Sequence, residues 1–164
     1  MTETTCPGCG LKLLSDEAGL DLRYNASIAC RRLYDELSAF TLSSGDKDFI
    51  HQLAVDAYAA QHSGPQVKPI SIAFALIGPF LVFERGYTGR QVQLAHMALA
   101  KTRRQWPLFN RPITKARLTI FDALAGLTAQ NYQAQIKSWA ESVWEVWHSE
   151  HQAVSRLLDE LLYP

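Results

Sequence analysis

The sequence predicts an all-α fold, an antiparallel helical bundle of about five to six helices with an irregular N-terminal CxxC segment. Apolar residues recur at helical spacing along most of the chain, and capping residues with Gly or Pro breakers divide it into helix-length pieces. No segment alternates convincingly between apolar and polar residues, as a half-buried strand would. The turns between the pieces are short, which favours antiparallel neighbours.

The first two helices follow from their caps and breakers. Residues 1–26 contain Pro and several Gly residues and are expected to be irregular. Ser27 is a favourable N-cap for a helix that runs to about residue 42. Asp46 or Asp48 is expected to cap a second helix, which ends at His62 before the sequence SGP.

The third and fourth helices begin at equally clear signals. Pro69 suits the first turn of a helix that runs to about Glu84, and Pro79 should kink it. Thr88 follows the loop RGYTG and is expected to cap a fourth helix that reaches about Arg104.

The last third of the chain is expected to hold two more helices. The stretch WPLFNRPI contains two prolines and cannot be helical throughout. Thr119 or Thr114 caps a short helix around residues 120–125, and Thr128 opens a long final helix through Leu161.

Composition indicates one globular domain over residues 1–164. Hydrophobic residues make up 48% of the 164 and charged residues 20%. The 16 Lys and Arg balance the 16 Asp and Glu, so net charge gives no reason to expect a nucleic-acid or membrane partner. Zero net charge favours self-association. One core face is not expected to bury all of Trp139, Trp144 and Trp147, so we expect a homodimer. Nothing identifies a small-molecule ligand.

The chain shows no targeting or membrane-spanning pattern. Its first ten residues, MTETTCPGCG, lack the basic start and apolar stretch of a signal peptide. The longest uncharged run, PISIAFALIGPFLVF, is shorter than the roughly 20 residues that a spanning helix needs. Three cysteines make a poor disulfide framework and suit metal binding or free thiols in a reducing compartment. A cytoplasmic protein is expected.

The sequence Cys6-Pro-Gly-Cys9-Gly is typical of half a zinc site. A CxxC turn presents two thiolates to one ion, and glycines permit its tight backbone. Two idle thiols in a disordered tail are the plainer alternative. A thioredoxin-like redox pair is a third, but it would need a βαβ context that the sequence lacks.

Cys30 and His62 are the candidates for the other half. Cys30 lies in the first turn of the first predicted helix, and His62 lies in the last turn of the second. If the two helices form an antiparallel hairpin, both residues lie at the same end of it. Cys6, Cys9, Cys30 and His62 would then bind Zn²⁺, although Cys30 also suits a buried core thiol.

A second, catalytic site is the competing hypothesis. His51 and His62 share a helix face but lie roughly 16 Å apart, too far to bind one metal ion. His51, Glu84 and His151 could instead converge between helices, as two His and one carboxylate with an open position for chemistry. Asp56 is expected to be a buried acid that pairs with an Arg.

Several motifs together resemble a known family. CPGCGL, a Cys just inside the first helix, HQLAVDAYAAQH and SWAESVWEVW are similar to a family of small bacterial all-helical proteins known as a domain of unknown function. Such proteins often carry a His in the third helix, where this chain has IAFAL around Phe74, so a site that needs that His is not expected here. The resemblance spans nearly the whole chain and implies no activity. It implies that one set of residues belongs together: Cys6, Cys9, Cys30, His51, Asp56, His62 and His151.

Three functional hypotheses remain open from the sequence. In the first, a structural zinc ion ties the N-terminal segment to the first helix hairpin. In the second, the protein is a metal-dependent hydrolase or thiol transferase, loosely similar in fold to DinB-type four-helix proteins, with a site near His51 and His151. In the third, the Cys6 and Cys9 pair releases zinc on oxidation. A closed four-ligand site indicates structure, and three ligands plus water indicate catalysis.

Overall fold

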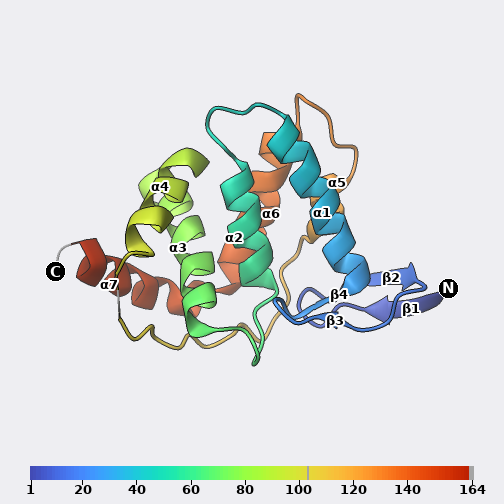
Figure 1. Ribbon diagram of the computed structural model, residues 1–164, viewed down its shortest axis with the longest axis horizontal. Coiled ribbons are helices and arrows are strands. Elements are labelled where there is room, and N and C mark those ends of the chain that lie inside the picture. Colours follow the sequence, from blue (N-terminus) through green and yellow to red (C-terminus); the bar gives the residue numbers. More distant parts are fainter. Residues whose placement is uncertain (103, 163–164) are drawn as a thin grey trace.

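The computed structural model describes residues 1–102 and 104–162 and is mainly helical (Figure 1). The strands gather at one end of the molecule, beside the start of the first helix, and the last helix lies at the opposite end. In chain order the elements are β1 Thr2–Thr5, β2 Lys12–Ser15, β3 Leu20–Asp21, β4 Ala26–Ser27, α1 Ile28–Ser43, α2 His51–Gln61, α3 Pro69–Arg85, α4 Gly89–Leu99, α5 Ile120–Leu124, α6 Tyr132–Val146, the 3₁₀ helix η1 His148–Glu150 and α7 His151–Leu162.

Three predicted helix starts are confirmed by their caps. Ser27 Oγ accepts the N–H of Cys30, and Thr88 and Thr119 each form a capping box at the start of α4 and α5. The second helix starts later than predicted. Asp46 Oδ2 accepts the N–H of Ile50 at 2.9 Å, so the acid caps the preceding turn, and α2 begins only at His51.

The prediction of an irregular N-terminal segment is wrong, because this segment forms two small antiparallel sheets. β1 pairs with β2, with Thr2 opposite Ser15, and β3 pairs with β4. The strands are two to four residues long, and β1 consists of Thr and Glu. Such short strands show no apolar alternation in the sequence, so the all-α prediction holds only for the bulk of the chain.

The predicted final helix is broken in two. α6 ends at Val146, Trp147 leaves the helical conformation, and η1 leads into α7. Trp147 is 1% exposed, so the break turns the chain without exposing the apolar stripe. The fourth helix also ends early, at Leu99 rather than near Arg104.

The core surrounds α2, which lies between α1, α3 and α6 (Figure 1). At Gly78 in α3 the helices approach so closely that a Cβ would lie 1.8 Å from Asp56 Oδ2 in α2. Trp139, Trp144 and Trp147 are all buried within the chain itself. The tryptophan argument for a homodimer is therefore wrong, and self-association stays a prediction from net charge alone. Among the described residues, no helix is both long and apolar enough to cross a membrane.

Candidate metal centre

The CxxC motif forms the turn between β1 and β2. The N–H of Cys6 donates to Leu11 O, and the N–H of Gly10 donates to Cys6 O, both at 2.8 Å. Gly10 has a φ of +81°, a conformation that L side chains rarely adopt. The turn thus directs the side chains of Cys6 and Cys9 inward, where they are 0% and 4% exposed.

The other two candidate ligands come from two helix ends that meet the turn. Cys30 lies in the first turn of α1, held there by the Ser27 cap. His62 immediately follows α2, and its carbonyl accepts the N–H of Asn25 at 2.8 Å. This last bond fastens the strand segment to the end of α2.

The structure brings Cys6, Cys9, Cys30 and His62 into one buried cluster, with their four ligand atoms all within 4.8 Å of one another. Cys9 Sγ lies 3.9 Å from Cys30 Sγ, and Cys30 Sγ lies 3.4 Å from His62 Nε2. Tetrahedral Zn²⁺ with bonds of about 2.3 Å to sulfur and about 2.05 Å to nitrogen would require about 3.8 Å and about 3.5 Å. The donor set and its spacing therefore fit zinc.

A second layer of contacts orients His62. Its Nδ1 lies 2.7 Å from the backbone carbonyl oxygen of Tyr58. A carbonyl can only accept a hydrogen bond, so Nδ1 carries the proton and Nε2 presents a lone pair to the thiols. The Tyr58 ring stacks on the imidazole at 3.9 Å between centroids. The Tyr58 hydroxyl donates to Cys30 Sγ at 3.5 Å, and burial raises its own pKa. Tyr58 thus supports two ligands at once.

The three thiols influence one another's ionisation. Hydrogen bonds from Cys30 and Cys9 lower the pKa of Cys6. Hydrogen bonding with Cys6 and Cys9, together with burial, raises the pKa of Cys30. At Cys9 the hydrogen bond from Cys30 lowers the pKa, but Cys6 and burial outweigh it and raise the pKa to about 12. Burial and the neighbouring thiols thus oppose ionisation of Cys9 and Cys30, and a bound cation would offset that cost.

Gly8 lets the CxxC turn approach the other ligands. A Cβ at Gly8 would lie 2.5 Å from Asn25 O and 2.6 Å from His62 Cδ2. Both distances are far below van der Waals contact, so any side chain here would push the turn away from His62. Gly8 is therefore required by the close approach of the turn to His62.

The three residues predicted to form a second, catalytic site do not meet in one place. His51 Nδ1 lies 2.7 Å from Thr41 Oγ1, at the start of α2 and away from His62. Glu84 Oε1 accepts the indole N–H of Trp144, whereas His151 stacks on the Trp144 ring at 3.7 Å. Among the described residues, His51, Glu84 and His151 do not form a group with metal-ligand spacing.

Asp56 is buried as predicted, but its partner is a histidine and not an arginine. Asp56 Oδ2 lies 2.8 Å from His96 Nε2, and Gln52 donates to Oδ1. Burial raises the pKa of Asp56, against the opposing effect of His96. His96 was not among the residues predicted from the sequence, although its position between the buried Val92 and Leu99 on α4 indicates an inward direction.

The chain matches a family described as "Family of unknown function (DUF5946)" over residues 4–148. No curated protein and no solved structure matches this chain. The chain therefore belongs to the DUF5946 family, and the match includes all four residues of the Cys₃His cluster. The seven residues that the resemblance grouped together do not form one cluster, because His51, Asp56 and His151 each have separate partners.

Proposed function

We propose that this member of the DUF5946 family binds one Zn²⁺ through Cys6, Cys9, Cys30 and His62, and that the ion is structural. The observation that carries the proposal is the complete, buried donor set: three sulfurs and one imidazole nitrogen within 4.8 Å of one another. Sulfur-rich tetrahedral sites select zinc among the common divalent ions. Four protein ligands leave no open position for a substrate or water.

The function of the ion is to fasten the N-terminal segment, residues 1–26, to the ends of α1 and α2. Within these residues only the side chains of Cys6, Cys9 and Ala26 are buried. Leu11, Leu13 and Tyr24 are only partly buried against the core, and two of the three fully buried side chains are zinc ligands. Metal binding therefore supplies most of what orders it.

The competing hypotheses have less support. A catalytic metal at His51, Glu84 and His151 has little support, because His51 contacts Thr41 while Glu84 and His151 contact Trp144. Within the part of the chain that the structure describes, the three do not form a group with metal-ligand spacing. A redox sensor needs thiols that an oxidant can reach, whereas all three thiols here are buried. Three thiolate ligands need reducing conditions to persist, which supports the expectation of a cytoplasmic location.

Metal analysis of untagged protein tests the proposal. We expect about one zinc per chain and thiols that react slowly in the native state, then quickly after chelation. The Cys9→Ser protein should lose the metal. The His51→Ala protein is the matched control and should keep it, because His51 contacts Thr41 and not the cluster. Metal-free wild-type protein with three freely reactive thiols would refute the proposal.

A further inference from the structure

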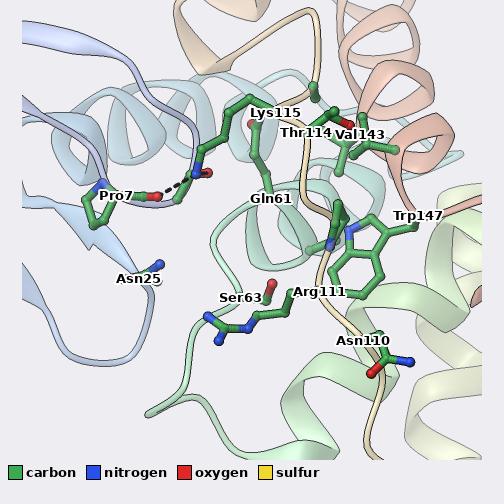
Figure 2. Close-up of a pocket in the computed structure, with 15 residues that line it drawn as sticks. Pro7, Asn25, Gln61, Ser63, Asn110, Arg111, Thr114, Lys115, Val143 and Trp147 are labelled. Carbon is green, nitrogen blue, oxygen red and sulfur yellow. Dashed lines mark hydrogen bonds between the residues drawn. The ribbon is translucent and has the colours of Figure 1, made fainter.

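A pocket of about 420 Å³ adjoins the metal centre on the side of the CxxC turn (Figure 2). Pro7 and Gly8 of the turn line one wall, and the end of α2 lines another. Residues 110–116 cross the opening, and the end of α6 forms the remaining side. Four segments that are far apart in the sequence therefore enclose one space.

The pocket is positively charged. Arg111 and Lys115 line it, and of the described lining residues none is acidic. Arg111 takes part in no salt bridge within residues 1–102 and 104–162. In Figure 2 its side chain extends from the crossing segment toward the side of the pocket where Ser63 and Asn25 lie. A guanidinium in this position has its fork of donors available for an oxyanion.

Lys115 is held in place by the CxxC turn. Its Nζ donates to Pro7 O and to Gly8 O, both at 2.7 Å (Figure 2). An ammonium group has three N–H donors, so two are used here and one remains. The two carbonyls also fix the position of the charge at the pocket wall, which lowers the entropy cost of a further contact.

The opposite side of the pocket is apolar. Val143, Val146 and Trp147 line it. Val143 is 0% and Trp147 1% exposed, so Val146 supplies most of the surface that a ligand could contact on this side. A pocket with two cations at one side and an apolar wall at the other favours an anion with a small apolar body.

We propose that this pocket binds a small organic oxyanion, a phosphate or carboxylate on a small apolar body. The oxyanion contacts the Arg111 guanidinium, with Ser63 nearby, and the charge of Lys115 adds to the positive potential of the pocket. The apolar body lies against Val146. This site goes beyond the structural metal, with which it shares the CxxC turn and the end of α2 as walls.

Calorimetric titration with three probes tests the proposal. Phenyl phosphate and benzoate carry the two oxyanions on the same ring, and phenol carries none. We expect saturable binding of at least one anionic probe at millimolar concentration or below, and no binding of phenol. Failure of both anions to bind at about 10 mM would overturn the proposal, as would equal binding of phenol.

Two arginine variants locate the site. Arg111→Gln should weaken binding of the anionic probe about tenfold or more, because it removes a charge-assisted contact. Arg117→Gln removes an exposed arginine of the same segment that does not line the pocket, and it should change the affinity by less than about twofold. Equal affinities for wild type and Arg111→Gln, or equal losses in both variants, would contradict the assignment. Neither variant alters a metal ligand, so zinc content measured on the same samples separates failure of this site from failure of the metal centre.

Discussion

Removal of the metal should free the N-terminal segment and leave the helices folded. The perturbation is chelation of the purified protein, with loss of zinc verified by metal analysis. The helices after Ser27 carry the apolar core, whereas Cys6 and Cys9 are the only buried side chains among residues 1–25. The segment and the bundle should therefore respond differently to the same treatment.

The structure gives the size of the effect. Apart from the metal ligands, the N–H of Asn25 donates to His62 O, and the Tyr24 ring packs against Tyr34 and Tyr58. Two salt bridges, Asp21–Arg31 and Glu17–Arg32, join the segment to α1, and Lys115 donates to the CxxC turn. Contacts of these kinds each contribute about 0–1.5 kcal/mol. Structural zinc contributes about 10–16 kcal/mol at pH 7. If even a third of the lower figure holds the segment, its loss raises the open fraction by roughly two orders of magnitude.

Trypsin reports the opening at a defined residue. Lys12 lies within β2 and is protected when the sheet is docked, whereas Lys47 lies in the exposed turn before α2 and serves as an internal reference. We expect cleavage after Lys12 to accelerate about a hundredfold or more on chelation, with little change at Lys47. Circular dichroism should show nearly unchanged helicity.

Two outcomes would refute this reasoning. Continued protection of Lys12 after verified metal loss would mean that the segment is held by its own contacts. If chelation removed both the helicity and the protection of Lys12, the metal would support the whole fold and not the segment alone.

Three further predictions follow from single contacts. Gly8→Ala should destabilise the zinc-loaded protein by about 1–3 kcal/mol in urea unfolding, because its Cβ meets Asn25 O and His62; an unchanged midpoint would contradict the close approach. Tyr58→Phe should weaken zinc binding about 10- to 100-fold in chelator competition, since Cys30 loses its donor; equal affinity would exclude that role. Burial lowers the pKa of His51 in the folded state. As the pH falls below about 6.5, the unfolded state therefore binds this proton more readily than the folded state, and the free energy of unfolding decreases. His51→Gln should reduce that loss between pH 7 and 5.5, and an unchanged pH dependence of unfolding would argue against it.

The sequence was sufficient to identify the four residues of the buried Cys₃His cluster. A CxxC turn has few structural uses in a chain without a disulfide pattern, which singled out Cys6 and Cys9. Cys30 and His62 followed from helix topology, because the start of one helix and the end of its antiparallel neighbour lie at the same level. The supporting contacts of Tyr58 were not predictable in detail, since they depend on rotamers and on the tautomer of His62.

Other features left no clear trace in the sequence. The apolar period continues through Trp147, so the break between α6 and α7 is invisible to a periodicity argument. The pairing of Asp56 with His96 depends on how α4 packs against α2. The pocket depends on where the irregular residues 110–116 cross the bundle, which no local pattern determines.

X-ray absorption spectroscopy of the untagged, zinc-loaded protein tests the central claim most directly. The four-residue cluster predicts a first shell of three sulfurs at about 2.3 Å and one nitrogen at about 2.0–2.1 Å, with no water ligand. A shell dominated by oxygen and nitrogen would place the metal elsewhere in the chain, and a shell that includes a water oxygen would show an open site. Either result would contradict a closed structural zinc at Cys6, Cys9, Cys30 and His62.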